Sequence, residues 1–354
     1  MTSPFIAATA RALPPHYHSQ AELSQALQDY WRDGGHHFNK ARVDSLHGSV
    51  QVQGRHLAIP MADYAPLDTF EKRNAVWIRE AVKLGEQAVR AAVERAGVKL
   101  TDIDVLCFTS ITGLATPSID ARLVNVLGLR NDVKRVPIFG LGCVAGVAGT
   151  ARVSDLLRGF PDATAVLLSV ELCSLTVQRN DLSLSNIIAS GLFGDGAAAV
   201  VVRGGGSKGQ GPRVLASESV FYPQTEDVMG WDFLDSGFKV VLSARVPEMV
   251  TTNVRGNVDG FLKKHGLTRG DITHWVAHTG GPKVLEAFEV ALELPKDALA
   301  RSWASLRQVG NLSSSSVLYV LDDLLRSGAA KSGDRGLMMA MGPGFCAELV
   351  LLQW

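Results

Sequence analysis

Cysteine is scarce in this chain, and its few cysteines show no cross-linking or metal-binding pattern. There are four among 354 residues, none of them in a CxxC pair or close to a histidine: Cys107, Cys143, Cys173 and Cys346. Disulfide-stapled secreted domains and zinc-binding domains both depend on closely spaced or paired ligands. The sequence therefore predicts a protein with no metal site that works in a reducing, intracellular compartment.

Long apolar runs and an excess of one charge are also absent. No segment approaches the ~20 apolar residues that a membrane-spanning helix needs, and residues 1–10 lack the basic region of a secretory signal. Lysine plus arginine and aspartate plus glutamate number 35 each, so no overall field attracts nucleic acid or an acidic membrane. We expect a cytoplasmic protein with no membrane span and no nucleic-acid partner.

What the chain does contain is a large apolar fraction and an internal repeat. With 46% hydrophobic residues it can bury a core large enough for one big domain or two packed halves. The motif SDLLR at 154–158 follows Gly142-Cys143 at the spacing at which DDLLR at 322–326 follows Gly310-Asn311. This self-similarity indicates a duplication. We place the two halves at residues 1–220 and 221–354.

Both halves show the same alternation of helices and strands. In the first half we expect helices at residues 74–96, 118–127 and 143–157, and strands at 105–109, 135–139, 163–170 and 197–202. In the second half we expect helices at 247–265, 282–292 and 312–325, strands at 273–278, 336–341 and 346–353, and a short linking strand before residue 312. This alternation predicts an α/β fold of two similar halves that share one core.

Cys143 is the strongest candidate for a nucleophile, although most buried cysteines are only small apolar residues. It ends a predicted strand and starts a predicted helix, where unpaired backbone N–H groups and the helix dipole stabilise a thiolate. Glycines at positions 140, 142, 146 and 149 leave room for close helix packing and for a ligand beside the sulfur.

His278 and Asn311 are the candidate partners of Cys143. His278 ends the predicted strand WVAH, precedes the turn TGGP, and is equivalent to Thr109 in the repeat. Asn311 is equivalent to Cys143, so a pseudo-twofold axis between the halves makes both face one cleft; an isolated asparagine would ordinarily be only a helix N-cap. A nucleophilic cysteine needs a proton acceptor and an oxyanion donor, which these two residues can supply.

Five ordered segments resemble the signature motifs of type III polyketide synthases, the chalcone-synthase-like branch of the thiolase fold. They are GCVAG at 142–146, GLFGDGAAAVVV at 191–202, HTGGPKVLEA at 278–287, GNLSSSSVLYVLDDL at 310–324 and MGPG at 341–344. The resemblance implies a homodimer, a thiolase-like αβαβα sandwich and a triad of Cys143, His278 and Asn311. It also implies acyl-CoA and malonyl-CoA as substrates, without any cofactor.

The implied reaction starts when Cys143, held as a thiolate by an imidazolium at His278, attacks an acyl-CoA thioester. Malonyl-CoA then loses carbon dioxide while His278 and Asn311 donate hydrogen bonds to the enolate oxygen. The enolate attacks the acyl group on Cys143, and repeated extension and cyclisation give a polyketide.

The resemblance further implies gatekeepers and cavity residues. Phe193 matches a gatekeeper phenylalanine between the CoA tunnel and the reaction chamber, with a core aromatic in a turn as the alternative. Val240 matches the second gatekeeper, unless an alignment gap moves that role to Phe238. Cys173 and Thr176 match positions that line the cavity.

The remaining substrate-binding predictions concern the motifs and local positive charge. Thr116 matches a residue that reaches into the partner subunit's cavity, and Gly281 and Ser313 lie within two of the motifs. Arg55 stands where the family has a basic cluster near the tunnel mouth, and Lys283 follows the TGGP turn. We predict that both basic residues bind coenzyme A, with plain surface solvation as the alternative for each.

The departures from the plant pattern favour an aliphatic chamber. They include the AMGPG sequence at 340–344 in place of GFGPG, and they suggest fatty acyl starters and alkylpyrone or alkylresorcinol products. The nearest alternative is a β-ketoacyl-ACP synthase III-like enzyme that uses malonyl-ACP, although TGGPK after His278 favours the polyketide branch.

Two further alternatives fit less well. A thiolase would use Cys346 as its second cysteine, but the contexts of His278 and Asn311 disagree, and a silent scaffold would not need a complete triad. The sequence leaves open the starter, the number of extensions, pyrone or resorcinol closure, and carrier-protein delivery.

Overall fold

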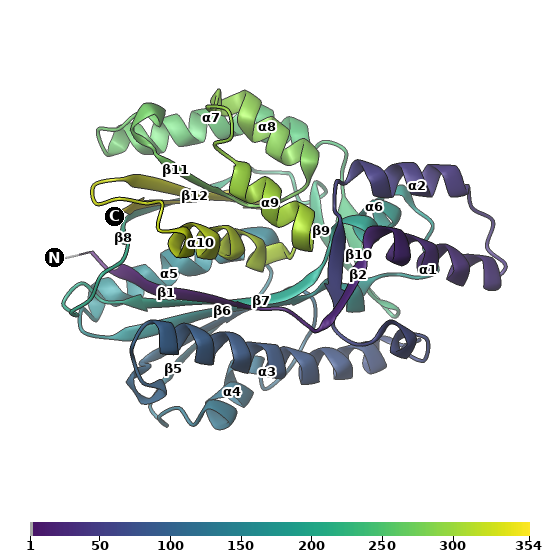
Figure 1. Cartoon of the computed structure of the whole chain (residues 1–354), viewed down its shortest axis with the longest axis horizontal. Coiled ribbons are helices and arrows are strands. Elements are labelled where there is room, and N and C mark those ends of the chain that lie inside the picture. Colours follow the sequence, from purple (N-terminus) through teal and green to yellow (C-terminus); the bar gives the residue numbers. More distant parts are fainter. Residues whose placement is uncertain (1–2) are drawn as a thin grey trace.

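A continuous run of nine hydrogen-bonded strands, which forms two main sheets with helices against both faces, organises residues 3–354, which the computed structural model describes (Figure 1). The first sheet contains, in spatial order, β5 (Lys134–Ile138), β4 (Val105–Thr109), β6 (Thr164–Leu172), β7 (Asp195–Arg203) and β1 (Phe5–Ala12). The second contains β11 (His274–Ala277), β12 (Arg335–Gly342), β13 (Cys346–Gln353) and β8 (Arg213–Phe221). The sheets join only where β1 meets β8, at the pair Phe5 and Arg213.

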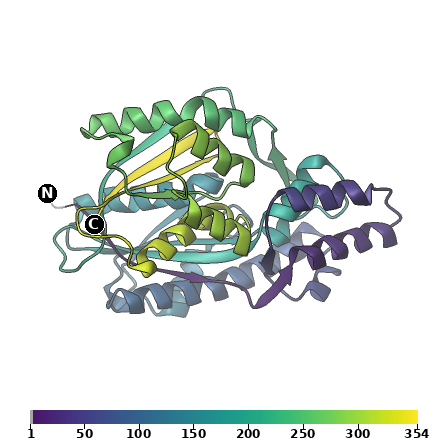
Figure 2. The ribbon, with the colours of Figure 1, turned by 45° about the horizontal axis from the view of Figure 1, so that its top comes forward.

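Helices complete five layers, which Figure 2 shows from a second direction. One outer layer holds α3 (Phe70–Arg95) and α4 (Ile119–Leu127), the central layer holds α5 (Ala145–Gly159) and α10 (Ser316–Ser327), and the other outer layer holds α7 (Val246–Lys264) and α8 (Pro282–Leu292). The predicted α/β class and αβαβα sandwich are confirmed.

Strand β6 illustrates why the central strands are apolar on both faces. Every residue of this strand is buried. Leu167 packs into the core formed with α5 and α10, whereas its neighbours Val166 and Leu168 pack into the core formed with α3. Successive side chains of a strand point to opposite faces, so a sheet between two helical layers needs a continuous apolar run.

The second half departs from the predicted repeat at one place. The expected linking strand before residue 312 is wrong: α9 (Ala300–Val309) fills this segment, and only an isolated bridge between Phe193 and Asn311 remains of a strand. The bridge does not extend into a strand, because the acceptor of the Asn311 N–H group is Leu192 O, and Leu192 is the last residue of a helix. The chain crosses from the first sheet to the second between β7 and β8, before residue 213, whereas we placed the boundary between the halves after residue 220.

Elements that the repeat did not reveal gather at one end of the sandwich, on the right in Figure 1. They are β2 (His16–Ser19), α1 (Gln20–Asp33), α2 (Lys40–Ser49), β3 (Gly54–Leu57), α6 (Leu184–Leu192) and the hairpin β9 (Met229–Leu234) and β10 (Gly237–Leu242). Within residues 3–354, no helix combines the length and apolarity that crossing a membrane requires.

Candidate functional site

Cys143 lies in a short 3-10 helix, η3 (Gly142–Val144), that leads directly into α5. Its side chain is buried, and Sγ lies 3.8 Å from the hydroxyl of Ser313. Gly142 has φ 52°, a left-handed conformation that favours glycine, and an added Cβ there would lie 2.8 Å from the ring of Pro343. The backbone can therefore make the tight strand-to-helix turn that presents the sulfur.

His278 directly follows β11 and faces the site without a protein partner. Its backbone N–H donates to Met339 O at 2.9 Å, which continues the strand pairing by one residue. Among residues 3–354, neither ring nitrogen has a hydrogen-bond partner, although the side chain is only 2% exposed. Buried polar groups are normally paired. Both nitrogens are therefore available to a substrate or to Cys143.

Asn311 has both a structural and a potential substrate role. Its Oδ1 accepts from Ser313 N at 2.8 Å and Ser316 Oγ at 3.2 Å, which fixes the orientation of the amide. Its Nδ2 donates only weakly, to Gly280 O at 3.5 Å. The capping interpretation and the oxyanion interpretation are thus compatible, because they use opposite ends of the amide.

The three residues line a single narrow chamber, in which about 20 Å³ is open to the centre of a water-sized sphere. The rest of its wall is apolar and includes Leu192, Phe193, Met229, Leu242, Val246, Val250, Val284, Met341 and Phe345. The residues come from both halves of the chain, as the pseudo-twofold argument predicted.

Burial makes the resting chamber unfavourable for isolated charges. It raises the pKa of Cys143 to about 12, partly offset by the Ser313 hydroxyl, and lowers the pKa of His278 to about 4. In both cases the charged form loses hydration. Neither group by itself therefore favours its charged form. The sequence, in contrast, led us to expect a preformed thiolate–imidazolium pair.

Glu171 is a buried carboxyl beside the site that sequence reasoning missed. It accepts hydrogen bonds from the hydroxyls of Ser314 and Thr112 and from Ile111 N. Burial raises its pKa to about 7 despite these bonds. Its signal in the sequence was a single charged residue within the otherwise uncharged strand at 164–172.

Phe193 stands between the chamber and a second cavity. It follows α6 as its C-cap, and it is the only residue among those described that lines both spaces. Gly281, which begins α8, has φ 135° and lies against Leu192. Phe193 thus separates two spaces, and its predicted role as the gatekeeper of a CoA tunnel stays a prediction.

The other predicted cavity residues are not part of the chamber wall. Cys173 and Thr176 are buried in the 3-10 helix η4 (Cys173–Thr176), where the Thr176 hydroxyl donates to Cys173 O at 2.8 Å; neither lines the chamber. Val240 lies on β10 two residues before Leu242, which does line it. Phe238 is occupied in an aromatic cluster, with its ring centroid 5.0 Å from that of Phe233.

Two predicted contacts lie at the surface, and one does not. Thr116 is exposed on this chain, and Lys283 is exposed on the first turn of α8, next to Val284 of the chamber wall. The alternative that Arg55 is a solvated surface residue is wrong. Its side chain is buried and donates to Ser190 O and to Phe193 O.

The chain resembles known proteins along its whole length. Residues 6–206 match the family "Chalcone and stilbene synthases, N-terminal domain", and residues 213–354 match the corresponding C-terminal domain. A 1,3,6,8-tetrahydroxynaphthalene synthase of Streptomyces peucetius subsp. caesius is 52% identical over 99% of this chain and 93% of its own. A phloroglucinol synthase of Pseudomonas fluorescens is 32% identical over 96% of each chain.

A solved structure shares the fold closely. The crystal structure of the 1,3,6,8-tetrahydroxynaphthalene synthase of Streptomyces coelicolor, a bacterial type III polyketide synthase, superimposes with a TM-score of 0.92. The two sequences are 33% identical, and the match covers 99% of both chains.

Proposed function

Because the chain belongs to the chalcone and stilbene synthase family and is a type III polyketide synthase, we propose that it condenses malonyl-CoA with itself into a small polyhydroxylated aromatic compound. A product of the 1,3,6,8-tetrahydroxynaphthalene type fits best. The observation that carries this proposal is the narrow chamber that Cys143, His278 and Asn311 share. The name of the 52% identical relative supports it.

The loading step uses the unpaired imidazole. As Cys143 Sγ attacks the thioester carbonyl, its proton passes to His278, and the new thiolate and imidazolium offset each other's loss of hydration. Coenzyme A leaves with a proton, and the acyl group stays on the sulfur.

The extension step uses the spare amide donor. The Nδ2 group of Asn311 and a ring N–H of His278 hold the thioester oxygen of a malonyl unit while its carboxylate leaves as carbon dioxide. The enolate carbon then attacks the thioester at Cys143, and the released sulfur takes part in the next transfer. Loss of carbon dioxide drives bond formation, so the proposed reaction needs neither a metal nor a redox cofactor.

Chamber size separates this proposal from the fatty acyl hypothesis. Only about 20 Å³ of the chamber is open to the centre of a water-sized sphere, which is room for on the order of one water molecule. The chamber must therefore widen to hold any substrate, and a compact ring system requires less widening than a long acyl chain does. The apolar wall still favours aliphatic starters as a second candidate, with the second cavity beyond Phe193 as additional space.

Substrate access and assembly complete the proposal. Thioesters approach past the first turn of α8, where exposed Lys283 can meet the phosphates of coenzyme A beside Val284. The working unit is a homodimer in which exposed Thr116 approaches the partner subunit's cavity.

Product analysis tests the choice of substrate. We expect purified enzyme with malonyl-CoA alone to yield a polyhydroxylated aromatic product, detected by mass spectrometry, and Cys143→Ala to yield none. Products that appear only when octanoyl-CoA to stearoyl-CoA is added would replace this proposal with the fatty acyl candidate. Activity with malonyl-ACP but not malonyl-CoA would support the β-ketoacyl-ACP synthase alternative.

Alkylation tests the proton transfer from Cys143 to His278. In His278→Ala the thiol has no proton acceptor, and burial alone raises its pKa. The reactive thiolate is the form favoured by rising pH, so at pH 7 we expect iodoacetamide to modify Cys143 at least about tenfold more slowly than in the wild type. The difference in alkylation rate between the wild type and His278→Ala should shrink as the pH approaches the raised pKa of Cys143.

Peptide mapping separates Cys143 from the other thiols, of which Cys107 and Cys173 are buried and have raised pKa values. Equal rates for Cys143 in wild type and His278→Ala at pH 7 would contradict the proposed role of His278.

A further inference from the structure

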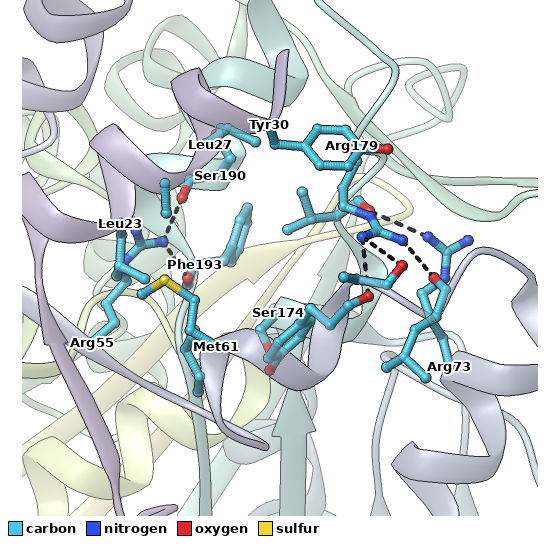
Figure 3. Close-up of a pocket in the computed structure, with 16 residues that line it drawn as sticks. Leu23, Leu27, Tyr30, Arg55, Met61, Arg73, Ser174, Arg179, Ser190 and Phe193 are labelled. Carbon is cyan, nitrogen blue, oxygen red and sulfur yellow. Dashed lines mark hydrogen bonds between the residues drawn. The ribbon is translucent and has the colours of Figure 1, made fainter. Parts of the chain in front are cut away.

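The second cavity lies across Phe193 from the chamber and has a polar and an apolar part (Figure 3). About 230 Å³ of it is open to the centre of a water-sized sphere. Its apolar wall comes from α1, from β3 and from the segment that follows β3. The apolar residues are Leu23, Ala26, Leu27, Leu57, Met61 and Leu67. The loading and extension steps proposed at Cys143 place no group in this space.

Three arginines line the cavity, on two opposite sides. In Figure 3, Arg55 lies beside Phe193, and Arg73 and Arg179 lie across the cavity from them. Arg55 is bound to carbonyl oxygens and to Gln20, and the buried carboxyl of Asp195 partly balances its charge. The Phe193 side is therefore close to electrically balanced.

The opposite side has an excess of positive charge. Among residues 3–354, no carboxylate lies within 4.0 Å of the guanidinium of Arg73 or Arg179. The negative charge of Asp68 partly offsets this positive charge at Arg73, but Asp68 forms its ion pair with Lys72. Burial and the positive charge of Arg179 both lower the pKa of Arg73. An anion between the two arginines would relieve this repulsion.

Both arginines also retain hydrogen-bond donors. A guanidinium has five N–H groups. Arg73 donates to Val177 O and Ser236 O, and Arg179 donates to Tyr64 O, Ala65 O and Leu67 O, so each keeps at least two N–H groups for a ligand. The Arg179 guanidinium, 5.0 Å from the Tyr30 ring centroid, is held in place by that ring.

Hydroxyl groups lie between the two sides. The Tyr64 hydroxyl is 2.6 Å from Ser174 Oγ, and both residues line the cavity. Ser174 in turn donates to the Asp195 carboxylate, which is on the Arg55 side. A negative group therefore gains little on the balanced Phe193 side and is attracted to the far side, and a chain with neutral oxygens can lie between.

We propose that the second cavity receives the distal end of the acyl chain carried on Cys143, and that Arg73 and Arg179 select chains ending in a carboxylate. The inference rests on the proposed function, because a chain primed with intact malonyl keeps a carboxylate at that end. The chain passes Phe193, and its head pairs with the two guanidinium groups. The substrate class is therefore an ω-carboxyacyl thioester.

Acylation of the enzyme tests this without any condensation. Wild-type enzyme is mixed with ω-carboxyacyl-CoA esters from succinyl to suberoyl, each paired with the unbranched monocarboxylic ester of equal length, and the acyl-enzyme is measured by intact mass. We expect faster loading of the carboxylate-bearing partner above a threshold length. In Arg179→Gln that preference should fall about tenfold, since a charge-assisted hydrogen bond is lost, and Arg179→Lys should keep part of it.

Arg32→Gln is the matched control, because Arg32 is an exposed arginine on α1 outside the cavity. It should leave the preference unchanged. Equal loading of paired esters by the wild type, which needs no variant to fold, would overturn the inference, and so would an unchanged preference in a folded Arg179→Gln enzyme.

A separate titration of octanoate into Cys143→Ala identifies the source of the carboxylate. Binding that depends on Arg179, without any loading preference in the wild type, would assign the cavity to free fatty acids and reject the tethered chain. Because loading precedes condensation, these results do not depend on which product the enzyme makes.

Discussion

Replacement of Cys143 by alanine should abolish polyketide formation and leave the release of carbon dioxide from malonyl-CoA measurable. The acyl chain has no other attachment point in the chamber, so we expect product to fall by roughly 10³-fold or more. Decarboxylation depends instead on His278 and on Asn311 Nδ2, which keep their places in the variant. Radiolabelled malonyl-CoA, followed as carbon dioxide and as product, measures both steps.

Asn311→Ala is the complementary variant. It removes the donor proposed to hold the enolate oxygen, so both carbon dioxide release and product should fall by about 10²-fold or more. Its Oδ1 also caps the segment at Ser313, and a thermal unfolding curve must therefore accompany the assay. Product formation by Cys143→Ala, or normal decarboxylation by a folded Asn311→Ala, would contradict the division of roles.

Replacement of Gly146 by alanine should damage both stability and activity. A Cβ at this position in α5 would lie 2.3 Å from Ser314 O and 2.6 Å from Val317 Cγ1, and a backbone oxygen cannot rotate away as a side chain can. The helices must separate where Cys143 and Asn311 are brought together. We expect a loss of about 3 kcal/mol in the free energy of unfolding and a strong loss of condensation, measured by urea denaturation and product assay.

Gly256→Ala is the matched control for this prediction. Gly256 is also helical, lies exposed on α7, and has no atom within 4 Å of an added Cβ. Alanine there should raise stability by up to about 1 kcal/mol, because glycine is the poorer helix former. Equal stability of the two variants would contradict the prediction, because it would show that the contact between α5 and α10 has room for a methyl group at position 146.

Local patterns made the catalytic candidates predictable. Cys143, His278 and Asn311 each follow a strand or precede a helix within a glycine-containing motif, and the repeat relates two of them. Arg55 was misjudged because its environment is not local: the carbonyl oxygens that bind it belong to residues 190 and 193. An arginine in a short, polar stretch looks solvated until those distant segments cover it.

The sequence by itself determined the alternation of helices and strands, the duplication and the identity of the three chamber residues, because apolar periodicity and glycine placement act over a few positions. The tertiary structure alone decided which charges are buried and which cavities adjoin. The raised pKa of Cys143, the lowered pKa of His278 and the place of Phe193 between two spaces all depend on segments far apart in the chain. So does the lack of a carboxylate within 4.0 Å of Arg73 and Arg179 among residues 3–354. Hydration is lost only when those segments pack together, and no local pattern records that loss.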